Sequence, residues 1–514
     1  MSDNSQQAPG KALIVGSGYS YLSLLVNKFI GVFTSIFLAR SLGPSNLGMI
    51  SIINYLLLLM LFFTGFGIPT AIVKLIPEIE LKNGSHETNK FVFSGFAINF
   101  IIMVVLSVIY LAISVPVAIS IYHEPKLISL IQLSVIALLF FSFNQYGNAI
   151  IQGFAEFRKL SLLSMFTSVF GFAVLIPSTK LWGIKGPVIA QAVNSIVTFL
   201  LLVLILKKTR KDLNLFSLSQ LLKPKSFLKD IRMNFHLRRL LPTAFPIFLS
   251  GLVMTPVLTI LTAILSRLQG FSDVGFFNIA YSLTQFILFV PTAVGTAFIP
   301  LASKLAVENQ VKLNNFLIKT IFGVDLIVIT IAFFISFFSK EIIYLFYGKS
   351  FSPVQSILIL LSIASFLSSF GYIFGYYLIS TNRLWFATIL NLIWFIAITG
   401  PASSLIKHFQ LNGLGLSYII AYIVLGIVSI IFIGQKIRIK QNYLLLHLIF
   451  GFILLCGLYF IKTYPIHFIF QIIVLFLFVL YLFYFTTKLF DKSDKDLIKV
   501  LLGNEVKRFL YFAK

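Results

Sequence analysis

Long apolar runs separated by short polar segments fill most of this chain. A helix needs about 20 apolar residues to cross the hydrocarbon core of a bilayer, and most of the runs have that length. Basic residues, prolines and glycines gather in the segments between the runs. The pattern predicts about 14 transmembrane helices, near residues 14–39, 47–73, 91–118, 127–152, 160–179, 186–206, 241–265, 275–302, 313–338, 353–379, 385–406, 413–434, 443–462 and 467–488.

The composition indicates a membrane protein and excludes a water-soluble enzyme. Of the 514 residues, 58% are hydrophobic and 11% are charged, and the mean hydropathy is +0.98. Soluble domains carry about 25% charged residues. We therefore expect an all-α polytopic membrane protein. Its polar N-terminal segment lacks the basic region of a cleavable signal peptide, so we expect none.

The sequence predicts no cofactor and no metal site. Its one cysteine, Cys456, lies in an apolar run, and its six histidines form no pair at the spacing of metal ligands. The sequence also lacks a glycine-rich nucleotide-binding loop, so we expect no direct use of ATP.

The basic charge follows a membrane topology. The chain has 40 lysines and arginines against 16 acidic residues, a net charge of +24. With the N-terminus inside, 30 basic residues fall on cytoplasmic segments and nine on outer segments, while Lys28 lies within a helix. This bias predicts a multi-pass protein of the plasma (inner) membrane with both termini in the cytoplasm. Topology and contact with anionic lipids account for the charge, so no nucleic-acid partner is expected.

The spacing of the helices predicts the domain organisation. A basic cytoplasmic segment at 207–240 is the longest polar stretch, and its leucines and phenylalanines are spaced as in a helix that lies on the bilayer surface. We interpret it as a linker between two six-helix bundles. The expected domains are the bundles at 1–206 and 241–434, two extra transmembrane helices at 435–490 and a short amphipathic tail at 491–514.

An internal repeat relates the two bundles. An offset of 227 in the numbering aligns the motif Ala39-Arg40-x-x-Gly43-x-Ser45-Asn46-x-Gly48 with Ser266-Arg267-x-x-Gly270-x-Ser272-Asp273-x-Gly275, and Gly186 with Gly413. Each repeat contains six helices, an even number, so both halves cross the membrane in the same direction. Transporters are often built this way, with substrate bound between the repeats near the middle of the bilayer.

Two helices at corresponding positions of the repeat carry polar stripes. Residues three and four apart lie on one face of a helix. The stripes comprise Ser51, Asn54 and Tyr55 on the second helix, and Asn278, Tyr281, Ser282 and Gln285 on the eighth. They favour a water-filled cleft between the bundles as the substrate site. The alternative is hydrogen bonding between packed helices, which is common in membranes.

The first helix carries a charge within the membrane. Lys28 and Asn27 belong to a polar arc of about 140°, and the carboxylates that could pair with the ammonium are missing from the first six helices. Burying an ammonium at mid-membrane costs about 2.5–3.5 kcal/mol, so we expect Lys28 to face water or an anionic ligand. The alternative is a lysine that reaches the interface or binds neighbouring carbonyls. In the second bundle, Asp325 is the one acidic residue well inside a helix; it is a candidate for coupling to an ion, with a structural role as the alternative.

Several segments resemble the polysaccharide-biosynthesis flippases, the Wzx-like branch of the multidrug/oligosaccharidyl-lipid/polysaccharide exporter (MOP) superfamily. The resemblance rests on the run from Phe37 to Glu78, which begins FLARSLGPSNLG, on IQGFAEFRKLSLLSM at 151–165, on STNRLWFATILNLI at 380–393 and on Gly413–Gly415. It extends over the chain through the number, order and repeat of the helices. It implies the V-shaped exporter fold of two six-helix bundles, followed here by two further helices.

The resemblance also implies a function. It suggests a non-enzymatic flippase that moves a polyprenyl-diphosphate-linked oligosaccharide from the cytoplasmic to the outer leaflet by alternating access, alongside membrane lipids and the polymerase and glycosyltransferases of the same pathway. Lys28 stands where related flippases of lipid-linked precursors have an arginine, and Thr34 stands in the place of their acidic residue. In this interpretation Lys28, with Arg40 and Arg267 at the outer rim, attracts the diphosphate, and the polar stripes contact the sugars.

Two other functions stay open at this point. A cation-coupled multidrug (MATE-like) exporter of the same fold would need a membrane-embedded carboxylate in the first bundle, where the sequence has a lysine instead. A membrane enzyme such as a glycan polymerase or ligase would need an acid and a base, usually on sizeable outer loops. The expected outer loops have about 15 residues or fewer.

Overall fold

The computed structural model describes residues 9–209, 234–436, 441–463 and 468–489. In this part of the chain the structure consists of 17 α-helices, one π-helical turn and one 3-10 turn, and it contains no strand. Most of the expected linker at 207–240 and the expected tail at 491–514 lie outside the described residues.

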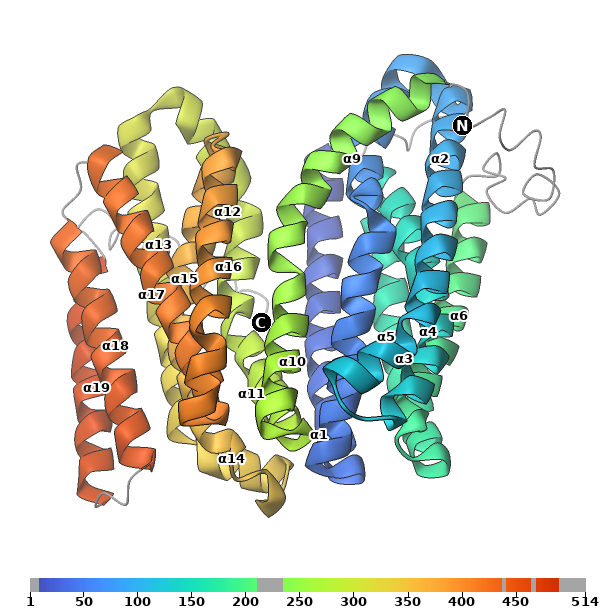
Figure 1. The fold of residues 1–514 in the computed structure, drawn as a ribbon. Coiled ribbons are helices and arrows are strands. Elements are labelled where there is room, and N and C mark those ends of the chain that lie inside the picture. The colour runs from blue at the N-terminus through green and yellow to red at the C-terminus, as the bar shows by residue number, and fades with distance from the viewer. Residues whose placement is uncertain (1–8, 210–233, 437–440, 464–467, 490–514) are drawn as a thin grey trace, which may run out of the picture. The chain divides into compact units, whose positions relative to one another are not determined.

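The chain forms two compact units, whose helices are labelled in Figure 1. The first unit comprises residues 1–282, 346–351 and 399–414, and the second comprises the rest. The helices of the first unit are α1 (Pro9–Gly65), α2 (Ile68–Ala112), α3 (Ser114–Pro116), the π-turn η1 (Val117–Ile121), α4 (Lys126–Gly153), α5 (Phe157–Trp182), α6 (Lys185–Thr209), α9 (Asn234–Met254), α10 (Pro256–Gln269) and most of α11 (Phe271–Ile287), with the 3-10 turn η2 (Lys349–Phe351).

The second unit contains the later part of the chain. Its helices are α12 (Phe289–Glu308), α13 (Gln310–Phe337), α14 (Ser339–Phe346), α15 (Val354–Ser380), the first part of α16 (Leu384–Phe409), most of α17 (Leu411–Lys436), α18 (Gln441–Thr463) and α19 (Phe468–Leu489). The compact units group some helices differently from the sequence-based domains, whose boundaries stay a prediction.

Glycines interrupt the two longest helices. A straight α1 of 57 residues would be about 85 Å long, far more than a bilayer core. Gly43, with φ 74° and ψ 174°, divides it into two segments that lie side by side in Figure 1. Gly84, with φ 80° and ψ 176°, divides α2 in the same way, and a break at Gly67 separates α1 from α2. The first three expected helices therefore occupy only two continuous stretches of helix.

The number of membrane crossings agrees with the sequence once these breaks are considered. Among the described residues, eleven helices are long and apolar enough to cross a membrane, or twelve if the bent pair α11–α12 is one span. The breaks turn α1 and α2 into three crossings, and α19 adds a shorter apolar helix, Ile469–Phe485. Each expected segment falls on these helices to within a few residues. The predicted class, an all-α polytopic membrane protein with about 14 spans, is confirmed.

The backbone repeats with the offset expected from the sequence. Three pairs of residues with left-handed φ are equivalent under the repeat: Gly43 and Gly270, Ala155 and Asn382, Gly183 and Gln410. Gly270 has φ 98° and ψ 177°, close to the angles of Gly43. Because such angles are rare, their recurrence at one offset shows that the two halves share a backbone path.

The turns before α6 and α17 are also equivalent. A Cβ at Gly186 would lie 2.3 Å from Ser178 O, and a Cβ at Gly413 would lie 2.1 Å from Leu405 O. Ser178 and Leu405 are themselves equivalent positions of the repeat. Only glycine allows each helix to approach the end of the preceding helix so closely. The sequence match of Gly186 with Gly413 therefore corresponds to one structural requirement that occurs twice.

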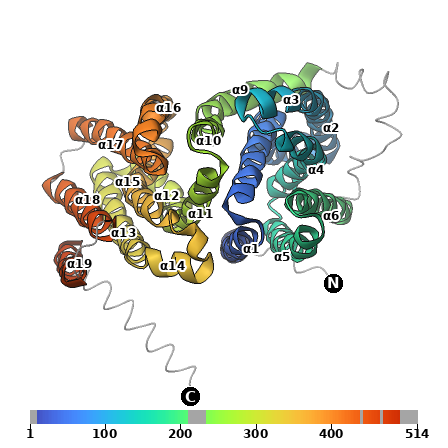
Figure 2. The ribbon, with the colours of Figure 1, turned by 60° about the horizontal axis from the view of Figure 1, so that its bottom comes forward.

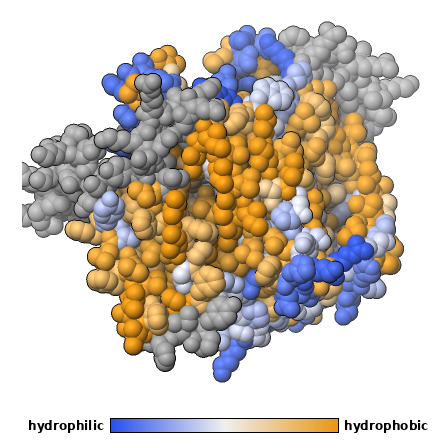
Figure 3. All heavy atoms as spheres, turned by 60° about the vertical axis from the view of Figure 1, so that its left-hand side comes forward, coloured by the Kyte–Doolittle hydropathy of each residue, from blue (hydrophilic) through white to orange (hydrophobic). Residues whose placement is uncertain are grey.

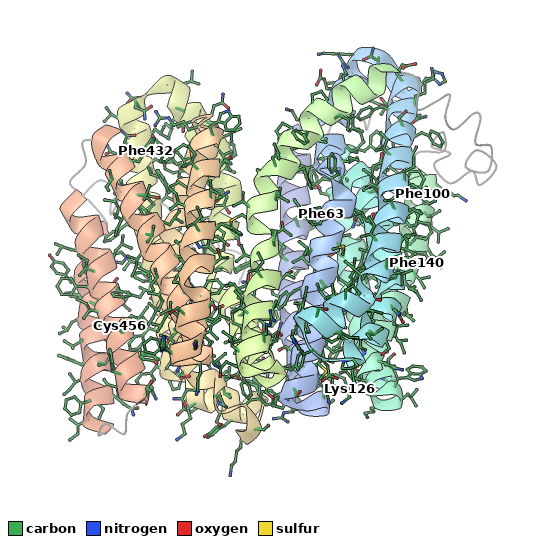
Figure 4. The ribbon with its side chains drawn as sticks, in the orientation of Figure 1. Phe63, Phe100, Lys126, Phe140, Phe432 and Cys456 are labelled. Atoms are coloured by element: carbon green, nitrogen blue, oxygen red, sulfur yellow. The ribbon has the colours of Figure 1, made fainter. Side chains whose placement is uncertain are left out.

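Aromatic side chains pack the interior of the first unit. Phe143 on α4 lies 5.9 Å from Phe96 and 6.1 Å from Phe100 on α2, and 5.3 Å from Phe199 on α6, measured between ring centroids. Figure 4 labels Phe100 together with Phe140, which lies one turn before Phe143 on α4. Such ring contacts help to hold α2, α4 and α6 together.

The surface of the second unit is apolar where α18 and α19 are exposed. Phe450, Phe460, Phe476 and Phe483 are each about half exposed or more. Figure 3 shows apolar side chains covering much of this side of the molecule. An exposed surface of this kind is expected against lipid tails and would aggregate in water.

Candidate functional site

A cavity lies among α1, α5 and α6 of the first unit. Its volume is about 280 Å³. Apolar groups form most of the wall, and seven polar residues line the remainder: Asn27, Thr34, Asn54, Thr167, Ser168, Gln191 and Asn194. These residues carry amides and hydroxyls, and no acidic residue lines the cavity among the described residues. The lining is suited to a neutral ligand with many hydroxyl groups.

Two serines of α5 fix the amide of Asn27. The Asn27 amide nitrogen donates to Ser164 Oγ at 2.7 Å, and Ser168 Oγ donates to Asn27 Oδ1 at 2.6 Å. Ser164 and Ser168 are four residues apart and therefore share one face of α5. Because both bonds come from the same face, the carboxamide is held in one orientation at the cavity wall.

The opposite wall contains unpaired acceptors. Gln191 on α6 donates from Nε2 to Asn54 Oδ1 at 2.7 Å, which joins α6 to the second segment of α1. Gln191 Oε1 and Asn194 Oδ1 are buried and have no hydrogen-bond partner in the described structure. A buried acceptor without a partner is unfavourable unless water or a ligand hydroxyl donates to it. These two oxygens are thus the groups most ready to bind a polyol.

Lys28 lies beside this cavity and not among its lining residues. It follows Asn27 by one residue, so its side chain leaves α1 about 100° around the helix from Asn27. It is half-buried. Among the described residues, no hydrogen bond or ion pair involves its ammonium group. The cavity and the charge therefore occupy neighbouring faces of α1.

The two polar stripes meet at one point. Asn278 on α11 donates from Nδ2 to the Tyr55 hydroxyl at 3.0 Å, and Tyr55 O accepts from Thr259 on α10 at 3.2 Å. Tyr55 is only 8% exposed. Asn54, by contrast, faces the cavity. Tyr55 and Asn278 thus bond two packed helices, as in the alternative interpretation of the stripes.

The remaining members of the predicted site lie apart from the cavity. Tyr281 is partly buried and packs on Phe277, with 5.5 Å between ring centroids. Gln285 and Asp325 belong to the second unit. Arg267 is exposed in the last turn of α10. The structure therefore brings Asn27 and Asn54 together, while the other predicted residues occupy separate places.

Arg40 is tied to the segment after α14. Its Nε donates to Phe346 O at 2.8 Å. Close by in sequence, Ser35 Oγ and the Tyr347 hydroxyl lie 3.4 Å apart within hydrogen-bonding distance. Burial raises the pKa of Tyr347 above its ordinary value, so this phenol stays neutral. Both contacts attach residues 346–347 to the end of the first segment of α1, just before the break at Gly43.

The polar residues of α5 and α6 were not among those predicted from the sequence. Ser164 with Ser168, and Gln191 with Asn194, have helical spacings that place each pair on one face. The same reasoning that selected the stripes of the second and eighth helices would have found them.

The cavity lining is specific to the first half of the repeat. In the second half, the positions equivalent to Asn27, Asn54, Ser168, Gln191 and Asn194 hold Met254, Tyr281, Phe395, Tyr418 and Ala421. Apolar and aromatic groups thus replace amides and hydroxyls. The two halves of the repeat thus share a backbone path, but the first half carries more polar side chains at these positions.

Metal-binding side chains do not cluster in the part of the chain that the structure describes. Among the described residues, no group of three or more histidine, cysteine or acidic side chains lies close enough to hold an ion.

Comparison with known proteins agrees with this architecture. The chain is similar in fold to the lipid II flippase MurJ in an inward closed conformation, with a TM-score of 0.69, 17% identity and coverage of 94% of this chain and 100% of that chain. It is also similar to a multidrug resistance MATE family transporter of the MOP superfamily in an inward-facing conformation, with a TM-score of 0.64, 19% identity and coverage of 80% and 94%. No curated protein matches the chain by sequence.

A family profile covers more than half of the sequence. The profile described as polysaccharide biosynthesis protein matches residues 13–306, which span α1 to α12. This range contains the cavity, Lys28 and the repeated glycine motif. The chain therefore belongs to the polysaccharide biosynthesis protein family and is a multi-pass membrane protein that shares the fold of MurJ and of MATE transporters.

Proposed function

We propose that this protein moves a polyprenyl-diphosphate-linked oligosaccharide from the cytoplasmic to the outer leaflet of the plasma membrane by alternating access. The observation that carries the proposal is the cavity of about 280 Å³ lined by amides and hydroxyls. Sugars present many hydroxyl groups, which pair with such side chains as donors and acceptors. The unpaired oxygens of Gln191 and Asn194 are positioned to accept from them.

Lys28 is the proposed contact for the diphosphate. An ammonium with no partner among the described residues is available to an anionic group. It binds phosphate as a point charge, without the bidentate geometry of arginine. Because Lys28 and Asn27 are adjacent, one substrate can reach both while its lipid tail stays in the bilayer. Arg40 and Arg267, both exposed, are proposed to attract the diphosphate at the outer rim.

The proposed function also implies neighbouring enzymes and an orientation in the membrane. The substrate is lipid-linked, so we expect the flippase to act next to the glycosyltransferases that complete the oligosaccharide and the polymerase that consumes it. Both termini are proposed to lie in the cytoplasm, in agreement with the basic cytoplasmic segments. The protein positions and moves its substrate and makes no covalent change to it.

The test is transfer of a fluorescent lipid-diphosphate-linked oligosaccharide across vesicles that contain the purified full-length protein. We expect Lys28→Ala to lower the rate about tenfold or more, since a hydrogen bond to a charged group contributes about 1.5–3 kcal/mol. Lys28→Arg should retain most of the rate. Lys126→Ala, which removes an exposed lysine at the start of α4, is the matched control. Absence of transfer by the wild type would refute the flippase, whereas transfer unaffected by Lys28→Ala would refute only the role of Lys28.

A multidrug exporter is the second candidate, because the fold is also that of MATE transporters. A cationic drug is bound best by acidic side chains or a cage of aromatic rings. Phe172 is the one aromatic residue among the described residues that line the cavity, and none of them is acidic. Efflux of cationic dyes from the same vesicles, without transfer of the oligosaccharide lipid, would favour this candidate.

A further inference from the structure

Asp325 is a fully buried carboxyl group in the middle of α13. Ser369 Oγ on α15 lies within hydrogen-bonding distance of Asp325 Oδ1, and it also lies 2.6 Å from Phe366 O. Asp325 Oδ2 is buried without a hydrogen-bond partner. Asp325 Oδ1 and Phe366 O thus compete for the single hydrogen of the Ser369 hydroxyl, and Asp325 Oδ2 has no donor.

A proton on Asp325 resolves this competition. The hydroxyl of Ser369 has a single hydrogen, which can serve either the carboxylate or Phe366 O. If the carboxyl group is protonated, it donates to Ser369 Oγ, and the serine hydrogen goes to Phe366 O. Every hydrogen then has an acceptor. The geometry therefore fits a neutral acid better than a carboxylate.

The surroundings offer the carboxylate no cation. Among the described residues, no ion pair involves Asp325, and α15 contains no charged side chain along its length. The charged groups of α12, Lys304 and Glu308, are exposed and pair with each other at 3.7 Å. An ionised carboxylate in this apolar place would be strongly unfavourable, and a bound proton removes that penalty.

Two polar groups of the C-terminal helices face the same region. His447 on α18 is fully buried, and its Nδ1 lies 2.7 Å from the hydroxyl of Tyr481 on α19. His447 Nε2 is buried without a partner. His447 and Tyr481 are thus buried titratable groups on the two helices that pack against α13. Lys462 of α18 also faces α13, but it lies 4.9 Å from the ring centroid of Phe337, about three turns beyond Asp325.

Aromatic contacts join this pair to the Asp325–Ser369 pair. The ring of His447 lies 4.7 Å from Phe322 and 6.1 Å from Phe366, measured between centroids. Phe322 and Phe366 each precede their polar neighbour, Asp325 or Ser369, by three residues, so they lie one turn away on the same helix face. The four helices α13, α15, α18 and α19, drawn as neighbours in Figure 2, thus meet at one buried cluster.

The first half of the repeat has a neutral version of the same contact. Ser142 on α4, at the position equivalent to Ser369, lies 3.5 Å from Asn99 Oδ1 on α2. Asn99 occupies the place next to the equivalent of Asp325, and its amide nitrogen donates to Thr64 O at 2.9 Å. An amide is therefore sufficient to join this pair of helices. A carboxyl group in the second half adds the ability to bind and release a proton.

We propose that Asp325, with Ser369, forms a proton-binding site in the second unit, and that the bound proton stabilises the packing of α18 and α19 against α13 and α15. When the proton is lost to water, Asp325 becomes an unpaired carboxylate. This charge favours a looser packing of these four helices, in which water can reach Asp325. The site is independent of the oligosaccharide substrate and concerns the two helices that follow the repeat.

The test uses the purified full-length protein in lipid nanodiscs and does not measure transport. Infrared difference spectroscopy should detect the carbonyl stretch of a protonated carboxyl group in the wild type at about pH 7, and this band should disappear in Asp325→Asn. Asp325→Asn reproduces the neutral Asn99–Ser142 contact, so we expect it to fold. Glu78→Gln, which changes an exposed carboxyl group, should leave the band in place.

A second measurement tests the link to packing. The unfolding temperature of the wild type should fall as the pH rises above about 4, because the folded state retains a proton that an unfolded carboxyl group releases there. Asp325→Asn should lack this part of the pH dependence. A wild type without the band, or a band that persists in Asp325→Asn, would overturn the proposal. If Na⁺ stabilises the wild type and Asp325→Asn abolishes this effect, the site binds a metal cation in place of a proton, and the proposal would also be overturned.

Discussion

Gly48 and Gly275 pass each other where the second segment of α1 crosses α11. A Cβ at Gly48 would lie 1.8 Å from Phe271 O, and a Cβ at Gly275 would lie 2.3 Å from Pro44 O. Pro44 and Phe271 occupy equivalent positions, so the two contacts are also equivalent under the repeat. Reciprocal contacts of this kind are those that a two-fold axis produces, and here the axis passes between the two glycines.

This crossing predicts a strict requirement for glycine. Gly48→Ala and Gly275→Ala should each lower the unfolding temperature of the purified protein in detergent. The added methyl group meets backbone atoms, which cannot rotate away, and overpacking typically costs about 1–3 kcal/mol. Gly457→Ala on α18, where a Cβ would meet nothing within 4 Å, is the control and should leave the temperature unchanged or raise it slightly, since alanine has less freedom in the unfolded chain. Equal stability of all three variants would contradict the close crossing.

The repeat also provides a matched test of backbone strain. Gly183 and Gln410 occupy equivalent positions with φ 55° and 52°. A side chain in this region costs roughly 1–2 kcal/mol, while glycine adopts it freely. We expect Gln410→Gly to stabilise the protein by up to about 1 kcal/mol, after the greater freedom of glycine in the unfolded state is subtracted. Gly183→Ala should destabilise it. Thermal unfolding of both variants measures the effect, and a change of the same sign in the two would contradict the equivalence.

Much of the fold could be predicted from the sequence because crossing a bilayer requires long apolar runs. The equivalence of Gly43 and Gly270 could also be predicted, since both lie in the same glycine motif. The break at Gly67 could not, because it falls inside a continuous apolar run. In such a run, a change of helix direction leaves the hydropathy pattern unchanged.

The candidate site was harder to predict for a physical reason. Lipid and protein interior are both apolar, so the pattern does not reveal which face of a helix is buried. Asn54 and Tyr55 belong to the same polar stripe in the sequence, yet one faces the cavity and the other bonds α11. Asp325 was recognisable as a buried charge, whereas its partner Ser369 lies 44 residues away. Only the folded chain shows that contact.

The unpaired acceptors of the cavity predict a transport defect. Gln191→Ala removes both the bond to Asn54 and a buried oxygen that is free to bind a hydroxyl group. If this wall holds the sugars, the rate of oligosaccharide transfer should fall about tenfold, the effect of losing roughly 1–1.5 kcal/mol of hydrogen bonding.

The control for this variant is Gln310→Ala, which removes an exposed amide bonded to Asn314. It should transfer the oligosaccharide at the wild-type rate. A fall in the unfolding temperature of Gln191→Ala without any change in transfer would show that the Gln191 amide serves only to join α6 to α1.

The bond between Tyr55 and Asn278 predicts the opposite outcome, a loss of stability with little loss of transfer. Tyr55→Phe removes the acceptor of the Asn278 amide in a place that is largely buried, which should cost about 1 kcal/mol. Asn278→Ala should cost a similar amount, and the double variant should cost less than the sum of the two because both changes break one bond. Tyr344→Phe, an exposed tyrosine on α14, is the control. Additive losses of stability would mean that the two side chains do not contact each other. A transfer rate that falls while the unfolding temperature stays constant would mean that they contact the substrate.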